Sequence, residues 1–396
     1  MKKSASSSYG KLILALTLIK TIMRRTKITP ITLFIITLLF YSCTEKFYLE
    51  DDSELAILVV DGKITNQLGP YEVRLFRTIN LDKADTLNPE EGASIFIYDG
   101  DGNSYQYQEI SSGVYETQDS NFQGQVGQSY WIEIQTISGE RYESSPETIQ
   151  PEISIESIYG EESSLLQDNG SSVNAVKIVM DAKDSSNQSS YLRWEYQESW
   201  EWRNPFYEPK TDTPSTQCYP YAYSNDVFIF DGSQQGIKEF KHLISSSILQ
   251  NEVKFNYEYF IRLSLYSVNF DCYEFWKNIQ SSIQSNGSLY DVIPFNTTGN
   301  ICPCNSDLLV LGYFEASSVN SKNASFSTHD FEMEFADFPS ECEKFTIKLR
   351  SGSPSADTYQ ILEEYWEDDA HVFIVRFNFC FDCNVKYSPN KPSFWP

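Results

Sequence analysis

The chain has 396 residues, and its 30 lysines and arginines stand against 55 aspartates and glutamates, for a formal net charge of −25. Such an acidic chain should repel nucleic acid, which argues against a DNA- or RNA-binding role. Aromatic residues make up 15% of the sequence. Strand-favouring residues dominate and long helical periodicities are rare, so we predict a mainly β protein.

The first element in chain order is an apolar run at 31–43, ITLFIITLLFYSC, which ends at Cys43. Three basic residues within 24–27 precede the run, and Ser42 is the small residue before the cysteine. A charged stretch, a short apolar stretch and a small residue are typical of a secretory signal. We therefore predict a lipoprotein signal peptide over residues 1–42, with Cys43 acylated as the first mature residue.

This leader has consequences for location. The apolar run is shorter than the ~20 residues that span a bilayer as a helix. The alternative to a lipoprotein signal peptide is a plain signal anchor in which Cys43 is not acylated. Translation can start at Met1 or at Met23. Removal of residues 1–42 takes away seven basic and no acidic residues, so the net charge falls to −32. Each buried acyl methylene contributes about 0.8 kcal/mol, so two or more chains hold a protein on a membrane. The acidic segment 43–54 then forms a tether.

The next part of the chain, residues 55–150, alternates short strand patterns with turn signals. Strands are predicted at 55–65, 71–78, 93–98, 104–109, 113–116, 129–136 and 141–147. Short strands at this spacing predict an immunoglobulin-like β-sandwich. Between two of them, Asp85, Thr86 and Leu87 match a short acceptor pattern for bacterial O-glycosylation, which makes Thr86 a candidate; an ordinary loop is the alternative.

Pro151 marks the predicted start of a larger β-rich domain over residues 151–396. Its strand patterns lie at 153–159, 174–182, 190–198, 227–230, 258–267, 309–316, 323–328 and 371–379. Apolar residues recur at helical spacing over 273–283, which predicts a helix there, and a second short helix is expected at 238–248.

Seven cysteines besides Cys43 lie in this larger domain, at positions 218, 272, 302, 304, 342, 380 and 383. An exported protein favours disulfides, and an odd number leaves at least one thiol unpaired. The pairings expected here are Cys218 with Cys272, and Cys302 or Cys304 with Cys380 or Cys383. A zinc site built from Cys302, Cys304, Cys342, Cys380 and Cys383 is the alternative, which an oxidising compartment disfavours. A redox role for the last pair would need a helix to start there, and prolines follow instead.

Four aromatic residues stand close together in the sequence: Trp194, Trp200, Trp202 and Tyr207. Flat aromatic faces suit stacking on sugars or packing against a partner, so these residues are candidates for a binding platform. Strands also bury alternate aromatic residues by default, and core packing is the favoured interpretation.

Catalytic signals are few. The three histidines, at 242, 329 and 371, lie at no metal-ligand spacing, and the sequence contains no G-x-S-x-G, Walker or HExxH pattern. We therefore expect neither an enzyme nor a cofactor nor a metal centre.

Four features occur in a fixed order along the mature chain. They are Cys43 with its acidic tether and the strand LVVDG at 58–62; the helix at 273–283 followed by GSLYD at 287–291; Gly299 and Asn300 leading to LGYF at 311–314; and CFDC at 380–383 before Phe394 and Trp395. In this order they resemble a family of Bacteroidota lipoproteins that carries a domain-of-unknown-function label and is encoded beside SusC-like TonB-dependent transporters.

The resemblance implies a lipid-anchored outer-membrane protein on the cell surface. We expect a non-catalytic role, either in ligand binding or as an accessory to a TonB-dependent β-barrel. The alternatives are a structural or adhesion module and a hydrolase whose carboxylates are dispersed along the sequence.

Overall fold

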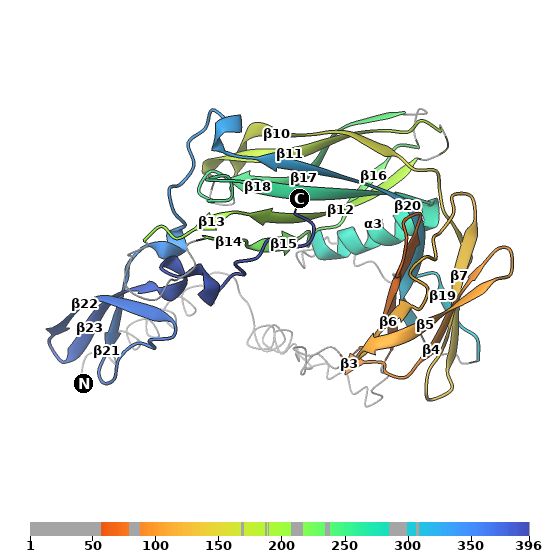
Figure 1. Ribbon diagram of the computed structural model, residues 1–396, viewed down its shortest axis with the longest axis horizontal. Coiled ribbons are helices and arrows are strands. Elements are labelled where there is room, and N and C mark those ends of the chain that lie inside the picture. The colour runs from red at the N-terminus through yellow and green to blue at the C-terminus, as the bar shows by residue number, and fades with distance from the viewer. Residues whose placement is uncertain are drawn as a thin grey trace, which may run out of the picture. The chain divides into compact units, whose positions relative to one another are not determined.

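Strands are the main regular structure in the described part of the chain (Figure 1). The computed structural model describes residues 57–78, 88–167, 170–186, 188, 190–206, 217–233, 238–284, 299–305 and 309–395. The prediction of a mainly β protein is confirmed. The predicted signal peptide, Cys43, the tether, Thr86 and Tyr207 lie outside the described residues. Among the residues described, no helix is long and apolar enough to cross a membrane.

Residues 57–150 form the strands that the alternating sequence predicts. They are β1 (Leu58–Thr65), β2 (Glu72–Arg77), β3 (Asn88–Pro89), β4 (Ser94–Asp99), β5 (Ser104–Ser111), β6 (Val114–Thr117), β7 (Ser129–Gln135), β8 (Arg141–Ser144) and β9 (Glu147–Thr148). Neighbouring strands pair in the order β1-β2-β6-β5-β4-β7-β8. Alternate residues, such as Leu58, Val60 and Ile64 of β1, are fully buried and pack into one hydrophobic core.

A second hydrophobic core lies between two further groups of strands. One is a three-stranded sheet of β10 (Ser154–Leu166), β11 (Ser172–Lys183) and β17 (Glu239–Leu249). The other contains β12 (Tyr191–Trp200), β15 (Tyr221–Tyr223), β16 (Phe228–Asp231), β18 (Tyr259–Val268) and β20 (Val310–Phe326). Leu192 of β12, Val176 of β11 and Phe240 of β17 meet in this core.

The prediction of a helix at 238–248 is wrong, because this segment is strand β17. Its pairing with β11 shifts register twice, and His242 has a positive φ of 59°. Such irregularities insert extra residues into a strand. The buried residues Phe240, Leu243 and Ile248 therefore recur at intervals that resemble a helical period.

The predicted helix at 273–283 is confirmed as α3 (Phe270–Gln284). Asn269 stands just before it, and its side-chain oxygen accepts a hydrogen bond from the Cys272 amide at 2.8 Å, which stabilises the first turn. The helix packs through Tyr273 and Phe275 on residues of β18 and β20.

Strand β20 joins the two parts of the chain predicted on either side of Pro151. Its first half pairs in parallel with β1, from Val310 to Ser317, and its second half pairs with the antiparallel β18, from Ser318 to Phe326. Val310, Phe314 and Ala316 thus belong to the hydrophobic core of the first part. The whole of 55–396 forms one compact unit.

The last strands form a separate small sheet in the order β21-β23-β22. Its members are β21 (Phe345–Leu349), β22 (Tyr359–Glu367) and β23 (Ala370–Phe377). The remaining elements are β13 (Trp202–Arg203), β14 (Gln217–Cys218), β19 (Ile301–Pro303) and the 3₁₀ turns η2 (Thr328–Asp330), η3 (Ser340–Cys342), η4 (Asn378–Cys380) and η5 (Cys383–Val385).

Two disulfides fasten this small sheet, and both differ from the predicted pairings. Cys342, just before β21, bonds to Cys380 after β23, and Cys218 of β14 bonds to Cys383. These bonds use three of the five thiols considered for zinc. The predicted partners Cys272, Cys302 and Cys304 are free thiols. Sequence spacing failed here because disulfide geometry depends on Cα atoms brought within ~7 Å by the tertiary fold.

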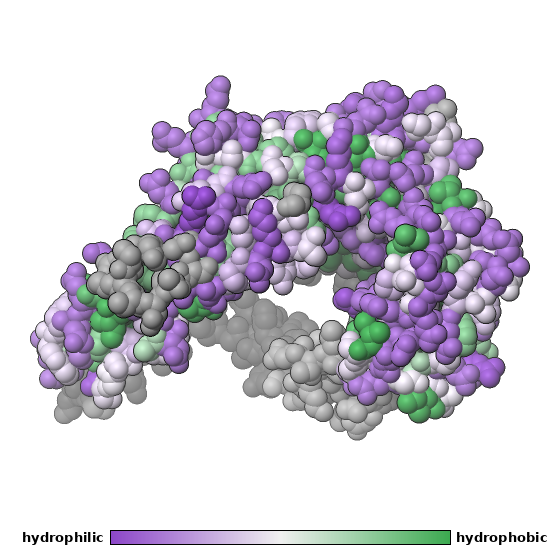
Figure 2. Space-filling model, in the orientation of Figure 1, coloured by the Kyte–Doolittle hydropathy of each residue, from purple (hydrophilic) through white to green (hydrophobic). Residues whose placement is uncertain are grey.

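The visible surface of the molecule is mainly hydrophilic. Figure 2 shows hydrophilic residues over most of the visible face, with apolar residues in small separate groups.

Candidate binding cavity

The aromatic residues proposed as a platform are not gathered on one surface. Trp194 is 5% exposed and stacks on Phe228, with ring centroids 5.5 Å apart, in the core that β12 and β18 share. Trp202 is equally buried but belongs to the core around the disulfides. Trp200 is half-buried beside the first of these cores. Trp194 and Trp202 are therefore core residues with no exposed face for a platform, whereas Trp200 is only partly buried. Tyr207 lies outside the described residues.

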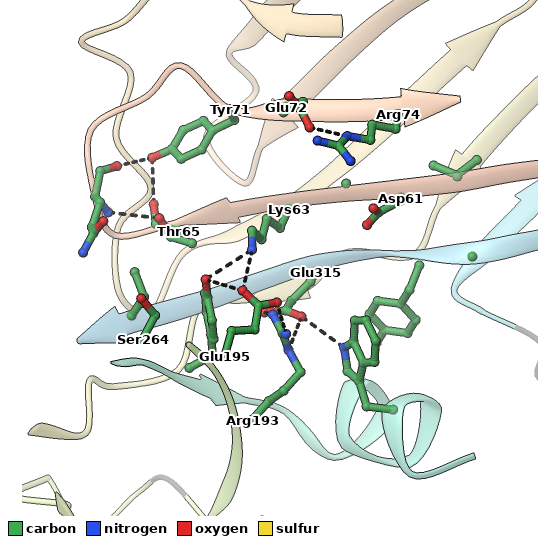
Figure 3. Close-up of a pocket in the computed structure, with 18 of the residues that line it drawn as sticks. Asp61, Lys63, Thr65, Tyr71, Glu72, Arg74, Arg193, Glu195, Ser264 and Glu315 are labelled. Atoms are coloured by element: carbon green, nitrogen blue, oxygen red, sulfur yellow. Dashed lines mark hydrogen bonds and ion pairs between the residues drawn. The ribbon is translucent and has the colours of Figure 1, made fainter. Parts of the chain in front are cut away.

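A cavity of 1090 Å³ lies where β20 leaves β1 and joins β18 (Figure 3). We call it the polar cavity. Its lining residues are Val59–Lys63, Thr65, Gln67, Leu68, Pro70–Glu72, Arg74, Arg193, Glu195, Gln197, Arg262, Ser264, Tyr266, Phe275, Trp276, Ile279, Leu311–Tyr313, Glu315, Val319 and Ser321. The volume matches that of cavities that bind small molecules.

Strand alternation supplies most of this lining. The strands β12, β18, β20 and β1 are neighbours in that order, and each turns alternate side chains toward the cavity. The intervening residues face the hydrophobic cores, for example Leu192 and Trp194 beside Arg193. The same alternation that builds the cores therefore places charged residues on the opposite face of the strands.

Arg193 is the most buried charge in the cavity wall, with 3% of its surface exposed. Its Nε and Nη2 donate to the two carboxylate oxygens of Glu315, at 3.0 and 3.1 Å. Its guanidinium carbon lies 4.3 Å from the ring centroid of Tyr266 and 4.7 Å from that of Trp276. Two-point hydrogen bonding and ring stacking together hold the guanidinium in one orientation.

Glu315 is equally enclosed and accepts several hydrogen bonds. Besides Arg193, the Ser317 hydroxyl donates to it at 2.7 Å and the indole N–H of Trp276 at 3.2 Å. Burial favours the neutral form, but Arg193 and Lys63 outweigh it and lower the pKa of Glu315 below its ordinary value. Glu315 is therefore an ionised structural partner of Arg193.

A second carboxylate connects the two sides of the cavity. Glu195 of β12 accepts a hydrogen bond from Arg193, from Lys63 of β1 at 3.4 Å and from the Tyr266 hydroxyl at 3.2 Å (Figure 3). Burial favours its neutral form, yet Arg193 and Lys63 lower the pKa of Glu195 to about 2. This arrangement balances two cations with two carboxylates, so the network carries no net charge.

Two charged lining residues stand apart from this network. Asp61 of β1 and Arg262 of β18 form no side-chain hydrogen bond or ion pair with any part of the chain that the structure describes. Surrounding protein raises the pKa of Asp61, and Lys63 and Arg74 only partly offset this. Both side chains are therefore available to a ligand.

A buried carboxylate supports the wall from behind. Glu147 is 3% exposed and accepts a hydrogen bond from the Tyr313 hydroxyl at 2.7 Å, as well as bonds from the amides of Asn269 and Asn300. Burial raises the pKa of Glu147 despite these donors. These contacts link β9, β20 and the start of α3.

Some cavity residues, such as Asp61 in LVVDG and Tyr313 in LGYF, lie in the motifs of the family resemblance, but no binding role was predicted for them. A signal was nevertheless present, because Asp61 and Lys63, and likewise Arg193 and Glu195, put charges at alternate positions of otherwise apolar strands. Charges on one face of such a strand indicate a solvated or functional face. The pattern alone does not tell which strands share that face.

The fold and the cavity define a mainly β protein whose strands carry a cavity lined by charged and polar side chains. The profile of the family described as Domain of unknown function (DUF4249) matches residues 44–323, and the chain belongs to this family. Every residue that lines the cavity lies within the matched region, whereas the small sheet β21-β23-β22 lies beyond it. No protein with a curated description matches the chain.

Proposed function

We propose that this chain is a lipid-anchored outer-membrane protein that binds a ligand in the polar cavity and assists a TonB-dependent transporter. The observation that carries the proposal is the cavity itself, because its wall combines a preorganised charge network with the unpaired groups of Asp61 and Arg262. A spacer or adhesion module has no need of such an interior. The apolar run before Cys43 and the resemblance to lipoproteins encoded beside SusC-like transporters support the location.

A non-catalytic role agrees with the state of the carboxylates. A general acid at neutral pH needs a raised pKa, whereas Arg193 holds both Glu195 and Glu315 ionised. One observation favours the hydrolase as second candidate: Asp61 lies in the cavity with a raised pKa. Turnover that Asp61→Asn abolishes, with ligand binding retained, would establish that alternative.

Ligand binding is tested by blocking the cavity. Ser264 faces the cavity from β18, so Ser264→Trp should fill part of it, while Ser104→Trp places the same side chain on an exposed site of β5. Native mass spectrometry of protein purified from its own cells should show a bound mass in wild type and Ser104→Trp, and none in Ser264→Trp. A bound mass that persists in Ser264→Trp would contradict the proposal.

The anchor and the partner are tested in native membranes. Wild-type protein in mild detergent should co-purify with a TonB-dependent β-barrel, and Cys43→Ser should move the protein to the soluble fraction. Membrane retention of Cys43→Ser equal to wild type would refute the lipid anchor. Purification without any β-barrel would refute the accessory role.

A further inference from the structure

The two ends of the polar cavity differ in chemistry. At one end, Asp61 lies beside Val59 on β1, opposite Tyr313 on β20, whose ring packs against Phe275 at 4.8 Å. On its other side Asp61 pairs in register with Arg74 of β2, so the carboxylate lies between aromatic residues and a basic residue. At the other end, Arg262 lies opposite Gln197 on β12 and next to Ser264 along β18, among groups that donate and accept hydrogen bonds.

The charged residues at the centre of the cavity neutralise one another, so they do not require a charged ligand. Arg193 and Lys63 are balanced there by Glu195 and Glu315. Near Asp61, Arg74 is paired with Glu72 at 2.5 Å. A complementary ligand is therefore neutral overall, with a cationic group for Asp61 and an anionic group for Arg262.

The sheet register sets the scale of such a ligand. Asp61 pairs with Tyr313 and Arg262 with Asn323, ten positions apart along β20. At about 3.3 Å per residue this separation is at most about 33 Å, and it is shorter where β20 changes from one sheet to the other. An extended peptide advances about 3.3–3.6 Å per residue, so a peptide of up to about ten residues can match this separation.

Resting on the proposed function, we infer that the ligand is an oligopeptide with its free N-terminal ammonium at Asp61 and its C-terminal carboxylate at Arg262. Its backbone amides alternate donors and acceptors, which suits the Gln197 amide and the Ser264 hydroxyl near the Arg262 end. A neutral sugar would offer no opposite charge to either group, so it would be less complementary to the cavity than a peptide with free ends.

The test uses end-blocked peptides as the probe. Mixtures of random peptides of about three to ten residues are prepared with free ends, with an acetylated N-terminus, with an amidated C-terminus, and with both ends blocked. Binding to the purified protein is measured by calorimetry and by mass spectrometry of retained peptides. Each single block should weaken binding about tenfold to a hundredfold, because it removes one charge-assisted contact.

Two variants assign the ends. Asp61→Asn should bind peptides with free ends more weakly than wild type, and its affinity should no longer depend on N-terminal acetylation but should still fall on C-terminal amidation. Arg262→Gln should also bind free peptides more weakly, but its affinity should depend on acetylation and not on amidation. Asp226→Asn and Arg350→Gln alter exposed charges that do not line the cavity and should behave as wild type. Circular dichroism checks that each variant is folded. The comparison of free and end-blocked peptides on the wild-type protein does not depend on any variant.

Equal binding of free and doubly blocked peptides, or no binding of any mixture at millimolar concentration, would overturn the peptide assignment. The cavity-blocking experiment with Ser264→Trp tests ligand binding in the cavity independently of the peptide assignment. A bound mass that disappears in Ser264→Trp, together with indifference to peptide ends, would keep the cavity as a binding site for another class of ligand.

Discussion

At the scale of single residues, the cavity depends on one buried arginine. Arg193 and Glu315 are 3% and 4% exposed, so each is stable in its charged form only because the other is present. The aromatic rings of Tyr266 and Trp276 restrict the guanidinium further. The sequence showed that β12 contains an arginine, but the partner lies 122 residues away, beyond any local pattern.

Replacement of this arginine should destabilise the protein strongly. Arg193→Met leaves Glu315 buried without its partner and should lower the free energy of unfolding by about 3–5 kcal/mol, measured by urea denaturation. The double variant Arg193→Met, Glu315→Leu should recover part of this loss. Arg74→Gln, in an exposed pair with Glu72, should cost no more than about 1 kcal/mol. Similar losses for Arg193→Met and Arg74→Gln would contradict this account.

The pH dependence of stability should have two opposite components. The pKa of Glu195 is lowered to about 2 from 4.5, so its contribution is present above pH 4.5 and is lost as the pH falls toward 2. The pKa of Glu147 is raised above 4.5, so its contribution is full below 4.5 and is lost as the pH rises through the folded-state value. In Glu195→Gln the melting temperature should fall less between pH 4.5 and 2, and in Glu147→Gln it should fall less as the pH rises above 4.5. Unchanged profiles would exclude these assignments.

At the scale of elements, strand identity was readable wherever alternation was regular. Strands β1, β2, β4 and β7 and helix α3 lie where the sequence periodicity predicts them. Strand β17 was misassigned because two register shifts distort its period. Alternation in the sequence shows which side chains share a face of the sheet only where the strand has no bulge or register shift.

The junction between β1 and β20 depends on a single glycine. Gly312 has a φ of +99°, and a Cβ there would lie 1.8 Å from the Val60 carbonyl oxygen. Gly312→Ala should therefore separate the two strands and cost about 3 kcal/mol or more. Gly352→Ala is the matched control, because Gly352 has a φ of +83° with open space around it and should cost only about 1–2 kcal/mol. Thermal unfolding measures both, and equal effects would contradict the role of the close approach.

At the scale of the whole molecule, the first part of the chain is completed by the second. Strand β1 is flanked by β2 on one side and by β20 on the other. Ile301, Val310 and Phe314 fill the core of the first part. The polar cavity lies at this junction, so neither part alone contains the whole cavity wall.

Residues 55–150 expressed alone should not fold stably. The fragment lacks β20, so β1 becomes an open edge strand, and the core loses the buried residues that the second part supplies. Residues 55–396 serve as the control and should give a cooperative unfolding transition. A soluble fragment with the dispersed amide spectrum of a folded domain would show that β20 is dispensable.

The sequence by itself determined the mainly β class, most strands, the long helix and the family resemblance, because these follow from local periodicity and from motifs read in order. Its strong negative charge likewise follows from composition alone. Only the tertiary structure decided the disulfide pairs and the polar cavity. Both depend on residues more than 30 positions apart that β pairing brings together, and pairing across such distances leaves no mark in the local pattern.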